Sequence, residues 1–180
     1  MSAASGRSVP STWFQWHASL VRPGTRVLDL ACGQGCNAIA AARRGATVVA
    51  VDADRDRLGD AEAAARKVGV PVEWVQADLT RDPLPPGAFD VVMQFNFLHR
   101  DRLPDFLAAV KPGGYFSAET FLEQQRELGW GPTSDDHLLK RGEIWSLVGR
   151  YEIVLAREAL EVLDGRTRAV ASVLARRPPE

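Results

Sequence analysis

The sequence contains few cysteines and predicts no metal site. Only two cysteines occur among the 180 residues, Cys32 and Cys36, and no other Cys or His lies near them in the chain. A zinc site needs about four such ligands, so zinc binding is not expected. We interpret both cysteines as small, partly buried, reduced side chains. The alternative is that Cys36 is a redox-sensitive thiol beside a ligand site.

The chain also lacks a charge excess and a long apolar segment. Its 22 Lys and Arg are balanced by 23 Asp and Glu, which argues against nucleic-acid binding through the overall field. No apolar run approaches the roughly 18 residues of a membrane span, so no contact with a membrane is expected. The N-terminal MSAASGRSVP has no apolar stretch typical of a secretion signal, so we expect a cytoplasmic protein.

Strand-like and helix-like segments alternate along the chain. With 46% hydrophobic residues, the length suits one core, and we expect a flexible tail over 1–10 and a single domain over 11–180. Apolar runs such as VVAV and VVM are typical of parallel strands buried on both faces. Asp164-Gly165 is a hairpin signal between the last two strands. The expected strands are 25–31, 47–52, 72–75, 89–95, 115–120, 151–163 and 167–174, and the expected helices are 11–21, 36–44, 54–68, 104–110 and 137–148.

These features predict an α/β fold with a Rossmann-like, doubly wound, seven-stranded sheet. The sheet is mostly parallel, with an antiparallel strand from the C-terminal hairpin. Ligands of such sheets bind at the carboxyl ends of the strands, where the strand order reverses. The segment VLDLACGQGCNA (27–38) joins the first strand to a helix there, and Gly33 and Gly35 allow a tight turn that approaches a ligand closely.

Three acidic residues lie at the ends of the first three expected strands: Asp29, Asp52 and Asp78. Asp52 follows Asp29 by 23 positions, near the roughly 20-residue spacing of a carboxylate that binds ribose hydroxyls. Asp54 is better placed to cap the next helix, which leaves Asp52 without an evident structural role. We expect Asp78 to contact adenine or to cap its loop, and Asp29 to orient the glycine loop or a ligand amino group.

The position of Asp29 favours a cationic ligand over a dinucleotide. A carboxylate four residues before Gly33 would oppose a pyrophosphate, whereas it suits an ammonium or a sulfonium. The third glycine of the dinucleotide pattern is replaced by Ala38. The residues therefore favour S-adenosyl-L-methionine over NAD as the cofactor.

At this point the segments VLDLACGQG, AVDAD, QADL, FDVVMQFNFLHR and KPGGYFSAETF resemble the successive motifs of class I S-adenosylmethionine-dependent methyltransferases. The resemblance covers about residues 25–120. The segments NFLHR (96–100), SAETF (117–121) and GPTSDDHLLKRGEI (131–144) resemble the small tellurite-resistance-type branch. That branch does not specify an acceptor.

The resemblance implies a set of cofactor-binding residues. Gly33 and Gly35 would lie along the methionine portion, Asp52 would bind the ribose, and the end of the fourth strand would border the sulfonium. The complete expected set is Asp29, Ala31, Gly33, Gly35, Asp52, Ala53, Asp78, Leu79 and Gln94.

The acceptor side is less specified by the sequence. Asn96, His99 and His137 are the candidate catalytic residues, although local packing is an equal alternative for His99. Methyl transfer needs alignment and desolvation, and it needs a base only when the nucleophile is protonated. Trp13, Phe14 and Trp16 would form a pocket wall or pack a helix on the sheet.

We expect transfer to a small acceptor such as a metabolite, thiol, amine or chalcogen oxyanion, because the chain has no inserted substrate domain. A macromolecular acceptor and a non-catalytic S-adenosylmethionine-binding module or subunit are the alternatives. An NAD-dependent or nucleotide-sugar reductase would need a catalytic Tyr/Lys pair or Cys that is not evident. The sequence leaves open whether the protein is a monomer or a homodimer.

Overall fold

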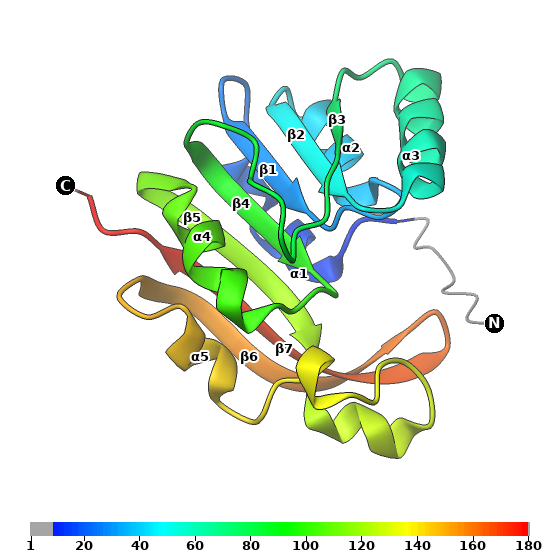
Figure 1. The fold of residues 1–180 in the computed structure, drawn as a ribbon, viewed down its shortest axis with the longest axis vertical. Helices are drawn as coiled ribbons and strands as arrows, with labels where there is room; N and C mark the ends of the chain where they lie inside the picture. Colours follow the sequence, from blue (N-terminus) through cyan, green and yellow to red (C-terminus); the bar gives the residue numbers. More distant parts are fainter. Residues whose placement is uncertain (1–8, 180) are drawn as a thin grey trace.

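A computed structural model describes residues 9–179, which form one seven-stranded sheet of order β3-β2-β1-β4-β5-β7-β6 (Figure 1). Strands β1 to β5 are parallel, whereas β7 runs antiparallel to both β5 and β6. The predicted fold class is therefore confirmed. The strands are β1 (Arg26–Leu30), β2 (Thr47–Asp52), β3 (Glu73–Gln76), β4 (Phe89–Phe95), β5 (Val110–Phe121), β6 (Glu152–Leu163) and β7 (Arg166–Arg176).

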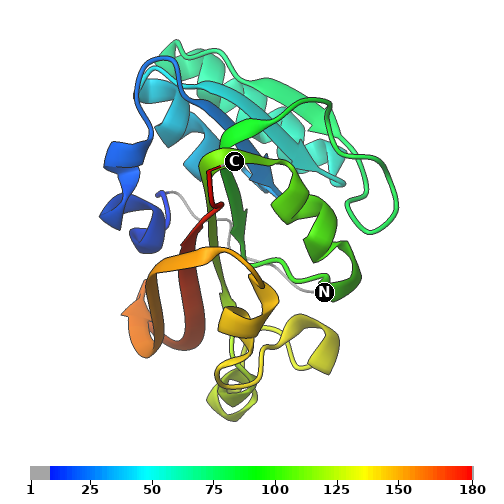
Figure 2. The ribbon, with the colours of Figure 1, turned by 90° about the vertical axis from the view of Figure 1, so that its left-hand side faces the viewer.

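Helices cover both faces of the sheet, as Figure 2 shows for α1 on one side and α4 on the other. Successive side chains of a strand point to opposite faces of the sheet, and each face carries its own core. On β1, for example, Val27 packs in one core and its neighbour Leu28 in the other. Trp13 belongs to the same core as Val27 and is fully buried. The helices are α1 (Thr12–Trp16), α2 (Cys36–Arg43), α3 (Arg55–Val68), α4 (Leu103–Ala108) and α5 (Glu143–Leu147).

Local signals define the helix ends well. The Ser11 side chain accepts a hydrogen bond from the Trp13 N–H, and the Asp54 side chain accepts from the N–H groups of Asp56 and Arg57. Gly69 ends α3 in the left-handed conformation, with φ 73°. The expected tail over 1–10 lies almost wholly outside the described residues.

Two expected boundaries are wrong for tertiary reasons. Residues 111–114 do not separate a helix from a strand: β5 begins at Val110, which pairs with Phe89, and the register shifts before Val91 pairs with Tyr115. This segment is therefore an irregularity inside a longer strand.

The helix expected over 137–148 is also shorter than predicted. Only Glu143–Leu147 is α-helical, because Leu139 instead forms a bridge with Leu122, and it is buried with Leu138. The remainder of the segment between β5 and β6 contains two 3₁₀ turns, η3 (Glu123–Leu128) and η4 (Asp135–His137).

The segment after β5 is held against β7 by side-chain hydrogen bonds. Gln125 is fully buried, accepts a hydrogen bond from the Ala169 N–H at 2.9 Å and donates to the Trp130 carbonyl at 2.8 Å. The Trp130 indole N–H donates to the Thr167 carbonyl at 2.8 Å. Within residues 9–179, no helix is long and apolar enough to cross a membrane.

Candidate active site

A cavity of about 1110 Å³ lies at the carboxyl ends of the central strands. One wall consists of the loops that follow β1 to β4. The other consists of the segment after β5 and the tip of the β6–β7 hairpin, which approach the first wall from the opposite side in Figure 1. Because β1 and β4 are neighbours while β2 and β3 extend to one side, this is the reversal of strand order where ligands of such sheets bind.

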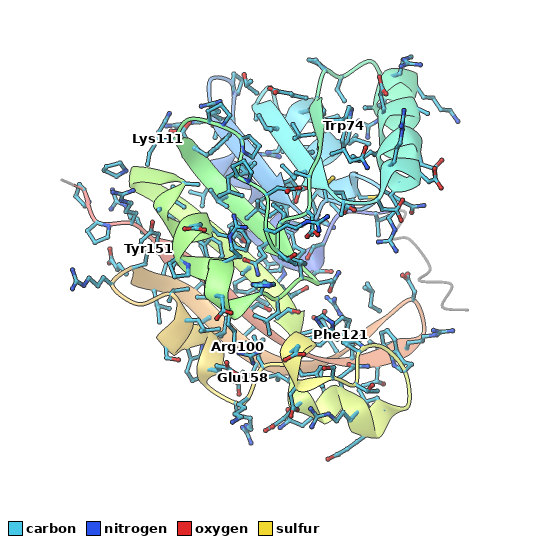
Figure 3. The ribbon with its side chains drawn as sticks, in the orientation of Figure 1. Trp74, Arg100, Lys111, Phe121, Tyr151 and Glu158 are labelled. Atoms are coloured by element: carbon cyan, nitrogen blue, oxygen red, sulfur yellow. The ribbon has the colours of Figure 1, made fainter. Side chains whose placement is uncertain are left out.

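The two glycines after β1 have different roles. Both are left-handed, with φ 55° at Gly33 and 74° at Gly35, but only Gly33 lines the cavity. A Cβ on Gly35 would lie 2.5 Å from the ring of Trp74 and 2.9 Å from the Cβ of Ala61. Trp74 is labelled on β3, near α3, in Figure 3. Gly35 therefore allows the start of α2 to pack closely against Trp74 of β3 and Ala61 of α3. Gly33 is the glycine that borders the ligand space.

Asp52 connects the glycine loop to the loop after β2. One carboxylate oxygen accepts a hydrogen bond from the Gly33 N–H at 2.7 Å, and the other accepts from the Asp54 N–H at 2.9 Å. The expectation that Asp52 has no structural role is therefore wrong, since two main-chain donors depend on it. Asp52 also lines the cavity and is only 8% exposed, so its remaining lone pairs can accept bonds from a ligand.

Asp29 is the most desolvated acidic residue of the cavity wall. It is 1% exposed, and its Oδ2 has no hydrogen-bond partner among the described residues. Burial raises the pKa of Asp29 to about 7, and the charge of Asp52 adds to this increase, while a hydrogen bond from the Ala38 N–H opposes it. A cationic ligand group near this carboxylate would stabilise its ionised form.

Asp78 lines the cavity and also orders its own loop. Its carboxylate accepts hydrogen bonds from the N–H and the hydroxyl of Thr80, and these bonds lower the pKa of Asp78, with Arg81 contributing. Of the two roles expected for Asp78, the loop-capping one is thus present. Leu79 and Ala53 line the same part of the cavity.

Three non-glycine residues of the cavity wall, Ala31, Asn96 and Asp164, have left-handed backbones. Ala31 has φ 55° and Asn96 has φ 54°, and they follow β1 and β4 directly. An alanine in this region costs about 1–2 kcal/mol, whereas asparagine tolerates it better. Such strain is concentrated at functional sites, and both residues lie where two strands meet the cavity.

Several expected site residues lie outside the cavity lining. Gln94 is buried and donates to the Phe97 carbonyl at 2.8 Å, beneath the loop after β4. His99 lies near Asp78, and its Nδ1 is buried without a hydrogen-bond partner in the described chain. His137 is exposed on η4. The roles expected for these three residues stay predictions that their positions do not favour.

The aromatic residues of α1 and the arginine after β4 have structural roles. Trp13 and Phe14 are buried in the core, and Trp16 is exposed, so α1 does not form a cavity wall. Arg100, labelled in Figure 3, forms a bidentate ion pair with Glu143, with distances of 2.6 and 3.0 Å. This pair attaches the first residue of α5 to the segment that follows β4.

The sequence did not identify the individual residues of the second wall of the cavity. Phe121 and Trp130 line it with their rings in an edge contact, 6.0 Å between centroids, and Phe121 is labelled at the end of β5 in Figure 3. Arg166 and Arg168 line it from β7. Only the three-dimensional pairing of β5, β6 and β7 brings these residues together. Gln34 and Asn37, which border the glycine loop, were also missed, whereas Cys36 lines the cavity, as the alternative interpretation of this residue expected.

A buried ion-pair network lies behind this wall. Glu119, 1% exposed, accepts hydrogen bonds from Arg168 at 2.7 Å, Ser172 at 2.8 Å and Arg157 at 3.3 Å. Glu161 pairs with both arginines. Although burial acts to raise it, the pKa of Glu161 is lowered by Arg168 and Arg157.

The first wall fits S-adenosylmethionine. Asp29 offers an unpartnered buried carboxylate oxygen for a cationic group, and Gly33 leaves open space where a side chain would stand. Asp52 offers acceptors for ribose hydroxyls, at the strand end where such carboxylates lie. No group of three or more potential metal ligands occurs among residues 9–179.

Comparisons with known proteins agree with this geometry. Residues 27–114 match the family model described as a methyltransferase domain. The chain is 34% identical over 132 residues to a ribosomal protein L11 methyltransferase of Symbiobacterium thermophilum, covering 71% of this chain and 42% of that protein. It is 36% identical over 123 residues to an uncharacterized methyltransferase of Mycobacterium tuberculosis, covering 64% and 61%. The chain thus spans less than two thirds of each relative.

Solved structures show the same fold. TehB from Haemophilus influenzae has a TM-score of 0.79 at 18% identity, covering 95% of this chain and 63% of that one. Magnesium protoporphyrin IX methyltransferase from Synechocystis, solved with S-adenosylhomocysteine, has a TM-score of 0.67 at 18% identity, covering 92% and 78%. Residues 27–114 therefore match a methyltransferase domain, and the chain shares its fold with solved S-adenosylmethionine-dependent methyltransferases.

Proposed function

We propose that this protein transfers the methyl group of S-adenosylmethionine to a small acceptor by in-line displacement. The observation that carries the proposal is one cavity with two chemically different walls. The first wall contains the desolvated Asp29 and the loop-bound Asp52, and the second contains aromatic and cationic side chains from β5, β7 and the segment between β5 and β6. Such a cavity has space for a cofactor and an acceptor side by side.

When bound, S-adenosylmethionine supplies an electrophilic methyl group on a sulfonium. Asp52 would bind the ribose, Asp29 would face the cationic part, and Ala53, Asp78 and Leu79 would border the adenine. Asn96 follows β4 directly and lines the cavity at the reversal of strand order. In sequence it comes after the loops of the first wall and before the segments of the second, and it would help to position the acceptor. The contribution of the protein is then alignment and exclusion of water.

The cavity wall offers little for general-base catalysis. Its lining in residues 9–179 includes no His, Lys, Tyr or Glu. Asp29, Asp52 and Asp78 border the cofactor half, Asp164 is exposed at the tip of the β6–β7 hairpin, and burial strongly raises the pKa of Cys32. A nucleophile that is soft or already anionic needs no proton removal, so this lining favours such acceptors.

The test is turnover by the full chain with S-adenosylmethionine, measured as S-adenosylhomocysteine formed with small thiols, carboxylates, amines, tellurite and selenite. Thermal unfolding with either sulfur compound, or with NAD, is measured in parallel. Ligand at 100 times its Kd adds about 2.7 kcal/mol, or about 5–10 °C for a chain of this size. We expect a rise with both sulfur compounds and turnover with one acceptor class.

Two other outcomes correspond to the alternative functions. Binding of the cofactor without turnover of any small acceptor would favour a non-catalytic binding module. Turnover only with a purified protein or nucleic acid would favour a macromolecular acceptor, for which the similarity to ribosomal protein L11 methyltransferases is the specific reason. A rise in unfolding temperature with NAD alone would contradict the cofactor assignment.

A further inference from the structure

We propose that the acceptor is an organic anion with a flat apolar body, bound between Trp130 and the arginines of β7. This inference rests on the methyl transfer proposed above and specifies its substrate class. Arg168, Arg166 and Trp130 form the subsite, together with Phe121.

Arg168 contributes a guanidinium nitrogen that lacks a partner. The side chain lines the cavity and is only 1% exposed. Its Nε and Nη2 bond to Glu161 and Glu119, but its Nη1 has no hydrogen-bond partner among the described residues. A buried donor without an acceptor costs about 1–3 kcal/mol, and the oxygen of an anionic ligand would remove this cost.

Arg166 contributes a cation that has no ion pair within residues 9–179. It is exposed near the hairpin tip, and its guanidinium lies 5.7 Å from the centre of the Trp130 ring. By contrast, the charges of Arg157 and Arg168 are balanced by Glu119 and Glu161. Within the described chain, the acceptor wall therefore combines one cation that forms no ion pair, Arg166, with one guanidinium nitrogen of Arg168 that has no hydrogen-bond partner.

The apolar part of the subsite is held in place by hydrogen bonds. The Trp130 indole N–H donates to the Thr167 carbonyl, and the buried Gln125 connects the Trp130 carbonyl to the main chain of β7. The Phe121 ring meets Trp130 edge-on, with 86° between their planes. Two fixed aromatic rings beside a cation favour a ligand with a flat apolar body.

The size of the cavity argues against a bare inorganic oxyanion. Sites for drug-sized ligands usually measure about 300–1,000 Å³, and this cavity of about 1110 Å³ would hold the cofactor and a second organic molecule. An oxyanion of a few atoms would leave the rings of Phe121 and Trp130 without contact.

Asp164 is the one acidic residue at the hairpin tip that also lines the cavity. It is exposed and left-handed, with φ 51°, a conformation that asparagine also adopts readily. Its charge opposes that of Arg166, so Asp164→Asn provides a control of opposite sign at the same location.

The probes are a matched pair, 2-naphthoate and its uncharged analogue 2-naphthamide, titrated into the full chain saturated with S-adenosylhomocysteine. We expect the carboxylate to bind at least about tenfold more tightly than the amide. In Arg166→Gln the affinity for naphthoate should fall about tenfold, whereas in Asp164→Asn it should rise about two- to threefold. The affinity for naphthamide should change less than about twofold in both variants.

Arg166→Gln and Asp164→Asn alter exposed positions, so both variants should fold. The test therefore does not depend on Arg168→Gln, which removes a buried charge and could prevent folding. Equal binding of carboxylate and amide, or an unchanged preference in Arg166→Gln, would overturn the inference. The affinity for S-adenosylhomocysteine is measured in the same samples, so failure of the cofactor site, which would contradict the proposed function, is distinguished from failure of the acceptor subsite.

Discussion

The two walls of the cavity are built by different physical means. The cofactor wall consists of short loops whose side chains bond to nearby main-chain groups, as when Asp52 accepts from Gly33 and Asp54. The acceptor wall depends on charged side chains brought together from three strands, with Glu119 on β5 facing Arg157 on β6 and Arg168 on β7. One wall is defined by local motifs and the other by tertiary pairing.

This difference has a consequence for how each wall tolerates change. Removing a side chain from the cofactor wall leaves main-chain groups that water can partly satisfy, so affinity should suffer more than stability. Removing a charge from the acceptor wall leaves a buried partner uncompensated, so stability should suffer first.

The largest loss of stability is expected for Glu119→Ala. It would leave the buried guanidinium of Arg168 with Glu161 alone, and breaking such a buried pair costs about 3–5 kcal/mol in the free energy of unfolding. Urea denaturation measures the loss. Glu62→Ala is the control, because its ion pair with Arg66 is exposed and is worth about 0.5 kcal/mol or less. Similar losses in the two variants would refute the contrast between the walls.

The largest loss of cofactor affinity is expected for Asp52→Ala. Losing a carboxylate that accepts ribose hydroxyls should weaken S-adenosylmethionine binding about 100-fold, as measured by calorimetry. Asp54→Ala is the matched control, since this neighbour caps α3 and should lose about 1 kcal/mol of stability with little change in affinity. Unchanged affinity in Asp52→Ala would refute the ribose assignment.

Asp29 makes the stability of the ligand-free protein depend on pH. Its pKa is raised by burial to about 7 from 3.8, so its stabilising contribution is complete below about pH 4 and is lost as the pH rises through about 7. Between pH 5 and pH 8 the Tm of Asp29→Asn should fall less than the Tm of the unaltered protein. The two decreases should differ by about 5 °C at pH 8. Parallel Tm curves for the two proteins would show that Asp29 is not the titrating group.

The smallest effect is expected for Ala31→Gly. Because Ala31 has φ 55°, glycine should relieve left-handed strain and stabilise the protein by about 1 kcal/mol. Ala63→Gly, at an exposed position inside α3, should have the opposite sign at about the same size. Destabilisation by Ala31→Gly would mean that contacts of the Ala31 methyl group outweigh the strain.

Much of the fold and of the cofactor wall could be predicted because its signals are local. The alternation of strands and helices predicts the sheet, Asp54 and Gly69 mark the ends of α3, and the glycines after β1 indicate the ligand loop. Spacing alone did not separate the role of Gly33 from that of Gly35, since the difference depends on how closely Trp74 and Ala61 approach.

Local sequence patterns specify the architecture, the strand end at which the cofactor half lies and the acidic residues that border it, because strand periodicity and turn chemistry act over a few residues. The acceptor wall, by contrast, forms through contacts between distant parts of the chain. Arg168 and Glu119 are 49 positions apart, and Trp130 contacts Thr167 across 37. Such pairs form only when β7 inserts between β5 and β6, a placement that no local pattern specifies.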